Sequence, residues 1–220
     1  MNKRSQTTQN TFLQACAEGD LETMRKWIAR GADVNMPEAR EHKPLAVALD
    51  NNQIEAMKLL LQNKADPNAL YITEPLIHWA FYLKNREAVD LLLKAGADPT
   101  PLEDGIYSII DFATRGQDEV LVNKALRILF EAGADMQEVY DEGLNAALVV
   151  QNKKLARKFL MRGARPDSAG PLFCFGFPPL VKAVRCKDRE MALLLVEFGA
   201  RAGICLPEVQ ELLSKEEDDD

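Results

Sequence analysis

A three-residue marker recurs six times along the 220-residue chain, at intervals of about 33 residues. Self-similarity at such a period indicates a row of small structural units, each of which cannot bury its apolar face alone. The copies are Gly31-Ala32-Asp33, Lys64-Ala65-Asp66, Gly96-Ala97-Asp98, Gly133-Ala134-Asp135, Gly163-Ala164-Arg165 and Gly199-Ala200-Arg201. This repeat constrains the fold more than any other feature of the sequence.

Each marker ends an apolar stretch that has helical spacing, such as Val89, Leu92 and Leu93 before Gly96. Glycine just past a helix end is a common stop signal, because it adopts positive φ without strain. A shorter segment rich in small residues lies upstream, where alanines let two helices approach closely; examples are residues 44–48, 77–80, 144–147 and 179–184. The pattern predicts a unit of two short antiparallel helices and a projecting turn.

This pattern resembles the ankyrin repeat, whose opening T-P-L-H-x-A is followed by a turn and a closing L-L-x-x-G-A-D. Residues 43–48 (KPLAVA) match the opening imperfectly, His78 lies at the signature histidine position, and residues 31–35 (GADVN) match the close. The resemblance covers about residues 10–201. It implies an all-α ankyrin-repeat solenoid of six helix-turn-helix units with a C-terminal capping helix.

Alignment of the units on their three-residue markers predicts the domain organisation. We expect a disordered N-terminal segment at residues 1–9, six repeats over 10–205, a capping helix at 206–215 and an acidic disordered tail at 216–220. The repeats span 10–42, 43–74, 75–107, 108–141, 142–177 and 178–205, and together they make one domain. The fourth repeat carries four extra residues near 115–123, which one added helical turn could absorb.

Charge and composition restrict the partners and the compartment. The formal net charge of -7 argues against binding to nucleic acid, which requires clustered Lys and Arg, and leaves a basic protein as a possible partner. No apolar run is long enough for a membrane span, and residues 1–10 do not resemble a secretory signal. We therefore expect a cytoplasmic monomer. Its cysteines show no CxxC spacing and are predicted to be reduced thiols, unless the compartment is oxidising.

Motifs that carry chemistry are missing from the sequence. It contains no glycine-rich phosphate-binding motif and only two histidines, His42 and His78, so we predict no cofactor, no metal site and no enzymatic activity. The resemblance implies that His78 hydrogen-bonds to the neighbouring projecting turn. A cryptic enzyme that uses His78 with a carboxylate is the less favoured alternative. The aspartates that recur with the marker are predicted to form turns: Asp33, Asp66, Asp98 and Asp135.

Members of the family that the sequence resembles bind other proteins through a concave face. The first helices and the projecting turns form this face. Tyr82, Leu83, Val149 and Val150 are large side chains at variable positions where most other units have polar or small residues. Irregular repeats that tuck these side chains between units are the alternative. Aromatic residues are enriched at interface hot spots. The candidate partner-binding residues are Tyr71, Trp79, Tyr82, Leu83, Tyr107, Tyr140, Val149, Val150, Phe173, Phe175 and Phe177.

Two questions stay open at this point. The phenylalanines of residues 173–177 either pack onto adjacent helices or form an exposed patch that awaits a partner. The function indicated is a scaffold or adaptor that binds another protein. A dedicated inhibitor or neutralising protein for one basic target is the alternative, and strong salt dependence of association would favour it.

Overall fold

The computed structural model describes residues 3–36, 43–99, 108–168, 177–201 and 206–214. The chain groups into two compact units, residues 1–99 and 100–220, where the sequence predicts one domain. Repeat proteins form contacts mainly between neighbouring units, so a compact grouping of three repeats is compatible with an array of six. The two units are described separately below.

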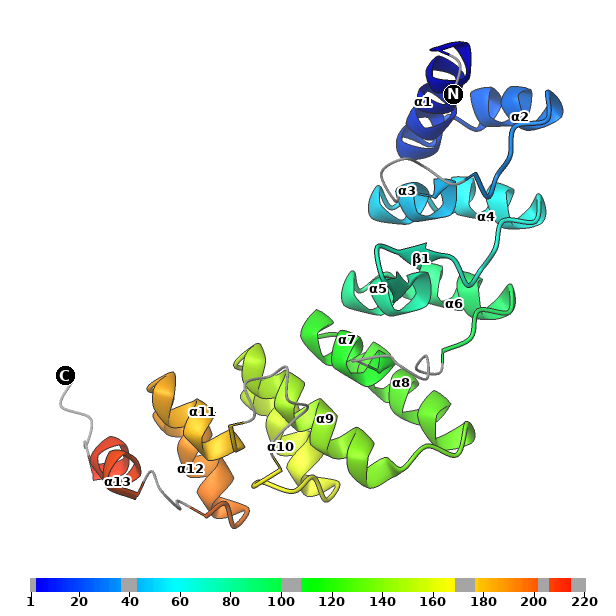
Figure 1. Ribbon diagram of the computed structural model, residues 1–220. Helices are drawn as coiled ribbons and strands as arrows, with labels where there is room; N and C mark the ends of the chain where they lie inside the picture. The colour runs from blue at the N-terminus through cyan, green and yellow to red at the C-terminus, as the bar shows by residue number, and fades with distance from the viewer. Residues whose placement is uncertain (1–2, 37–42, 100–107, 169–176, 202–205, 215–220) are drawn as a thin grey trace. The chain divides into compact units, whose positions relative to one another are not determined.

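The first unit consists of three helix pairs, which agree with the first three predicted repeats (Figure 1). The first helices α1 and α3 pack against each other, and the second helices pack α2 on α4 and α4 on α6. The core between them contains fully buried side chains such as Phe12, Leu45 and Phe81. The pairs are α1 (Lys3–Glu18) with α2 (Leu21–Ala29), α3 (Pro44–Asp50) with α4 (Ile54–Gln62), and α5 (Leu76–Tyr82) with α6 (Arg86–Lys94).

The N-terminal segment differs from its prediction. Disorder was expected for residues 1–9, but α1 begins at Lys3, so the prediction was wrong for residues 3–9. Residues 3–11 contain neither Gly nor Pro, and they lead directly into the face of α1 that buries Phe12 and Cys16. A helix that is anchored at its C-terminal half propagates backwards at low cost, because each further residue adds one hydrogen bond.

A small hairpin precedes α5 in a fold that is otherwise helical in its described parts. Strand β1 (Leu70–Tyr71) pairs antiparallel with β2 (Glu74–Pro75), with Leu70 opposite Pro75 and Tyr71 opposite Glu74. The sequence predicts only a projecting turn here. Tyr71, in β1, has high β propensity, and Ile72 and Thr73 form the two-residue turn between the strands.

The second unit contains three further helix pairs and a final helix. α13 (Leu206–Ser214) packs against α11 and α12, as predicted for a capping helix. The four extra residues of the fourth repeat lengthen α8 to 13 residues, compared with nine in α10. The pairs are α7 (Ile109–Gly116) with α8 (Glu119–Glu131), α9 (Met136–Val149) with α10 (Lys153–Met161), and α11 (Pro179–Arg185) with α12 (Arg189–Glu197).

Helix α9 begins earlier than the sequence predicts. It starts at Met136 and has 14 residues, so it replaces the projecting turn expected before the fifth repeat and crosses the predicted boundary at 141/142. The side chain of Asp135 accepts a hydrogen bond from the Gln137 N–H and caps this helix. Val139 is buried, which anchors the added turns. Tyr140 therefore lies within α9 and not in the projecting turn expected there.

Consecutive turns are joined by a hydrogen bond that repeats along the chain. The Asn35 Oδ1 atom accepts from the Asp66 N–H at 2.8 Å, and the Asn68 Oδ1 atom accepts from the Asp98 N–H at 2.7 Å. In the second unit, the Asp167 Oδ1 atom accepts from the Arg201 N–H at 2.8 Å. The predicted turn role of the aspartates is confirmed at Asp33 and Asp66, which each accept a nearby backbone N–H, whereas Asp135 caps α9 instead.

His78 also joins a helix to a neighbouring turn. Its ring is 1% exposed and hydrogen-bonds to the backbone of Pro99, in the turn after α6, which agrees with the predicted structural role. Its Nδ1 atom lies 3.7 Å from Glu74 Oε2. Burial lowers the pKa of His78 to about 4, against the smaller opposing effects of the Pro99 bond and the charge of Asp98. The imidazole is therefore neutral at physiological pH.

This lowered pKa predicts acid sensitivity. An unfolded imidazole titrates near pH 6.5, so between pH 6.5 and 4 the unfolded chain binds a proton that the folded chain does not. The contribution of His78 is complete above pH 6.5 and falls by up to about 3 kcal/mol as the pH decreases towards 4. Urea denaturation of the wild type and His78→Gln at pH 7.5 and 4.5, followed by the fluorescence of Trp27 and Trp79, measures it. We expect the wild type to lose more stability on acidification than the variant; equal losses would contradict the assignment.

Candidate protein-binding surface

Three aromatic side chains of the first unit stack on one another. Trp79 and Tyr82 are three residues apart on α5, so they lie on the same face of the helix. Their ring centroids are 4.9 Å apart, with an angle of 21° between the planes. Tyr71, from β1, stacks on Trp79 with a centroid distance of 4.8 Å and an angle of 13°. We refer to Tyr71, Trp79 and Tyr82 as the aromatic ladder.

Asp50, at the end of α3, fixes the aromatic ladder from the preceding repeat. Its Oδ1 atom accepts a hydrogen bond from Trp79 Nε1 at 2.6 Å, and its carboxylate is also bonded to the Tyr71 hydroxyl. Burial is the main cause that raises the pKa of Tyr71, and the charge and hydrogen bond of Asp50 add to it. The carboxylate therefore accepts hydrogen bonds from the polar atoms of two rings and holds the two rings in one geometry.

Apolar side chains extend this site towards solvent. Tyr82 is 40% exposed and Leu83 38%, and the hairpin contributes Leu70 and Ile72 at 39% and 56%. These residues and the aromatic ladder form what we call the ladder surface: Leu70, Tyr71, Ile72, Trp79, Tyr82 and Leu83. The sequence predicts four of the six; it misses Leu70 and Ile72, which a predicted hairpin would have indicated, and also the role of Asp50.

Ile72 lies in a backbone conformation that β-branched residues avoid. It is the first residue of the two-residue turn of the hairpin, and its φ is 58°. Two-residue hairpin turns favour Gly, Asn or Asp at positions of positive φ. A β-branched residue there is under strain, and such residues cluster at functional sites. The side chain of Ile72 is thus presented to solvent at an energetic cost.

Substitution of Ile72 by Gly is expected to stabilise the chain. Relief of about 1–2 kcal/mol of left-handed strain exceeds the roughly 0.5–1 kcal/mol lost to the greater freedom of glycine in the unfolded chain. The exposed side chain contributes little burial, so we expect a net gain of up to about 1 kcal/mol. The urea midpoint of Ile72→Gly measures this gain. A lower midpoint than that of the wild type would show that the packing of the Ile72 side chain outweighs the strain of its backbone.

The other predicted residues belong to the second unit or lie outside the described residues. In the second unit, Val149 is the last residue of α9 and is 50% exposed, while Val150, which follows it, and Tyr140 are half-buried. Phe177 is half-buried, with the Arg185 guanidinium 3.9 Å from its ring centroid, so this phenylalanine packs against α11. The remaining predicted residues, Tyr107, Phe173 and Phe175, lie outside the described residues.

Two further exposed side chains were not predicted. Phe130 on α8 is 69% exposed and Met161 on α10 is 73% exposed, both on second helices of the second unit. The repeat pattern predicts that apolar residues near the closing glycine pack inside. The longer α8 has no counterpart in that pattern, so the exposure of Phe130 could not be predicted from it.

The described residues offer little reactive chemistry. They contain no group of three or more His, Cys, Asp or Glu side chains that could hold a metal ion. Burial raises the pKa of the Cys16 thiol to about 12, and Cys16 and Cys186 are both free cysteines. Among the helices that the structure describes, we find none with the length and apolar character of a membrane span.

Comparison with known proteins identifies the family. A family model of ankyrin repeats in three copies matches residues 12–102. The crystal structure of the human ASB11 ankyrin repeat domain superposes with a TM-score of 0.67 and 26% sequence identity, over 87% of this chain and 85% of that domain. The chain contains ankyrin repeats. Ankyrin repeats are in general modules that bind other proteins, and their fold is typically non-enzymatic.

Curated relatives of this ankyrin-repeat protein are longer chains. Human "Ankyrin repeat and SOCS box protein 3" is 28% identical over 110 residues, which cover 44% of this chain and 20% of that protein. Human "Transient receptor potential cation channel subfamily A member 1" is 33% identical over 140 residues, covering 60% of this chain and 12% of the channel. The chain thus spans a fifth or less of the length of these two relatives.

Proposed function

We propose that this ankyrin-repeat protein is a non-enzymatic scaffold or adaptor whose partner protein docks on the ladder surface of the first unit. The observation that carries the proposal is the aromatic ladder, exposed at Tyr82 and half-buried at the other two rings, which a carboxylate from the preceding repeat holds in place. Tyrosine and tryptophan dominate the energy of protein interfaces because they bury a large area.

The geometry favours binding because the ladder surface is ordered before a partner arrives. Association normally costs about 0.5–1.5 kcal/mol for each flexible side chain that becomes fixed. Trp79 is stacked between two rings and bonded to Asp50, so most of this cost is removed for the ladder. Strain at Ile72, which presents an apolar side chain to solvent, supports the same proposal.

The proposal extends to the setting in which the protein works. Free thiols at Cys16 and Cys186 favour a reducing compartment, so we place the protein in the cytoplasm. We further propose that it acts as a monomer. The mass from light scattering, measured at concentrations up to those used for binding, checks the last point.

Affinity purification with two double variants tests the docking surface. Tyr82→Ala with Leu83→Ala removes the two exposed side chains of the ladder surface at the end of α5, and Val149→Ala with Met161→Ala removes as many exposed apolar side chains from the second unit. We expect quantitative mass spectrometry to show a co-purifying protein whose recovery falls about tenfold with the first pair and stays unchanged with the second. Equal recovery with all three proteins would remove the ladder surface as the site.

A further inference from the structure

We propose that the ladder surface binds an arginine side chain of the partner, with the arginine stem against Tyr82 and its guanidinium on Asp50, next to an apolar residue on Leu83. This inference rests on the proposed function and specifies the chemistry of the partner. It follows from the charge and the remaining hydrogen-bonding capacity of Asp50 and from its position relative to the exposed ring.

Asp50 retains capacity for a further donor. An ionised carboxylate can accept at about four positions. Trp79 Nε1 and the Tyr71 hydroxyl are the two donors that the described residues supply, and both approach from the side of the aromatic ladder. Asp50 is solvent-exposed, so its remaining acceptor sites are available to a partner. A negative charge at the edge of an apolar surface selects a cation.

The spacing of the site fits one arginine. Asp50 lies 2.6 Å from Trp79 Nε1, and the Trp79 ring lies 4.9 Å from that of Tyr82, so the carboxylate and the 40%-exposed tyrosine both contact the same indole ring. Arginine stems pack on apolar surfaces while the head group stays polar, and the guanidinium both stacks on aromatic rings and pairs with carboxylates. One side chain can therefore satisfy both features.

The residues that follow α5 have another preference. Lys84 follows Leu83 directly, beyond the end of α5, and is exposed. A like charge there disfavours a second cation. The ladder surface thus selects a basic partner residue at Asp50 and an apolar partner residue at Leu83. The positions of these two contacts set the direction in which a partner segment binds.

Selection from a random peptide library tests the inference without knowledge of the partner. The full chain is immobilised, and enriched peptides are resynthesised with arginine or with neutral citrulline, then measured against wild type, Asp50→Asn and Tyr82→Ala. Asparagine retains an Oδ1 acceptor for Trp79, and it replaces the second, charged oxygen by an NH2 group from which the Tyr71 hydroxyl can accept. We expect enriched peptides that pair arginine with an apolar residue, and about tenfold weaker binding for the citrulline peptide and for Asp50→Asn.

The possible outcomes separate this inference from the proposed function. Peptides that bind Asp50→Asn as well as the wild type, yet lose affinity for Tyr82→Ala, would overturn the arginine site and leave the docking surface intact. A selection that yields no peptide dependent on Tyr82 would overturn both. As a readout of position, the indole N–H signal of Trp79 in a ¹⁵N spectrum is expected to shift with the arginine peptide and not with the citrulline peptide. A shift confined to Trp27 would overturn the proposed site.

Discussion

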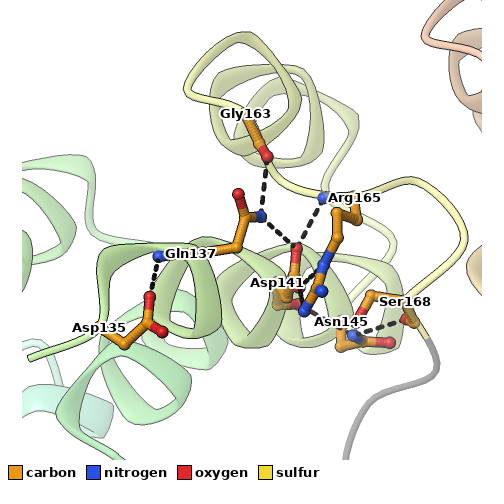
Figure 2. A network of polar contacts seen from close by, with 7 residues as sticks. All are labelled: Asp135, Gln137, Asp141, Asn145, Gly163, Arg165 and Ser168. Atoms are coloured by element: carbon orange, nitrogen blue, oxygen red, sulfur yellow. Dashed lines mark hydrogen bonds and ion pairs between the residues drawn. The ribbon is translucent and has the colours of Figure 1, made fainter.

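Replacement of Asp141 by Ala is expected to lower the free energy of unfolding of the second unit by about 2–4 kcal/mol. Asp141 is buried in α9, and its carboxylate accepts the Arg165 N–H at 2.6 Å (Figure 2). Its other bonds are to Arg165 Nε at 2.6 Å and Gln137 Nε2 at 3.1 Å. Since α9 replaces the turn that would supply an Asn or Asp acceptor, Asp141 takes over the bond that Asn35 and Asn68 provide elsewhere. Without it, the Arg165 N–H loses its acceptor.

Two variants serve as controls for Asp141→Ala. Asp141→Asn keeps an oxygen for the Arg165 N–H, and Asp167→Ala removes a single exposed hydrogen bond between turns. We expect each variant to lower the free energy of unfolding by about 1 kcal/mol or less, apart from the effect of the lost carboxylate charge. Both tryptophans, Trp27 and Trp79, lie in the first unit. Loss of helical circular dichroism at lower urea than the change in fluorescence would locate the damage in the second unit. A stability of Asp141→Ala equal to that of Asp167→Ala would contradict the role assigned to Asp141.

Substitution of Gly143 by Ala is expected to destabilise the second unit by about 1–3 kcal/mol. Gly143 lies in the interior of α9, where alanine would ordinarily gain about 1 kcal/mol in helix propensity. A Cβ atom at this position would lie 2.4 Å from both Cε1 and Cζ of Phe159, a fully buried ring on α10. Overlap with an immobile ring outweighs the gain in propensity, so the sign of the change is reversed.

A double-mutant cycle isolates this contact. Phe159→Leu alone should destabilise by leaving a cavity, but it provides space for the Cβ atom of residue 143. Gly143→Ala is therefore expected to cost less in the Phe159→Leu background than in the wild type, with a coupling energy of about 1 kcal/mol or more. Urea denaturation followed by circular dichroism gives all four values. Stabilisation by Gly143→Ala in the wild type would mean that α9 and α10 pack less closely than described.

The regular part of the fold could be predicted from the sequence because local signals and packing agree there. Helical spacing of apolar residues and a closing glycine recur in almost every repeat, and the structure has a helix pair at each of the six positions. The exceptions arise where a local signal overrides the repeat. Asp135 caps a helix as readily as it forms a turn, so the pattern alone could not show that α9 begins at Met136.

Most residues of the candidate site could be predicted from the sequence, but the contacts between them could not. Unusual side chains at variable positions indicate Tyr82 and Leu83, but the contact between Trp79 and Asp50 joins two repeats and depends on how they stack. The strain at Ile72 depends on the register of a hairpin that the sequence does not specify. Val149 and Val150 lie in the second unit, and their role in binding stays a prediction.

Site-specific photo-crosslinking tests the central claim most directly. A benzophenone amino acid replaces Leu83 in the ladder surface in one variant and Met161 on α10 in the other, both at exposed positions. If a partner docks on the ladder surface, irradiation is expected to give a covalent adduct of defined mass from position 83 and little or none from position 161. An adduct that forms at position 161 and not at position 83 would contradict the account.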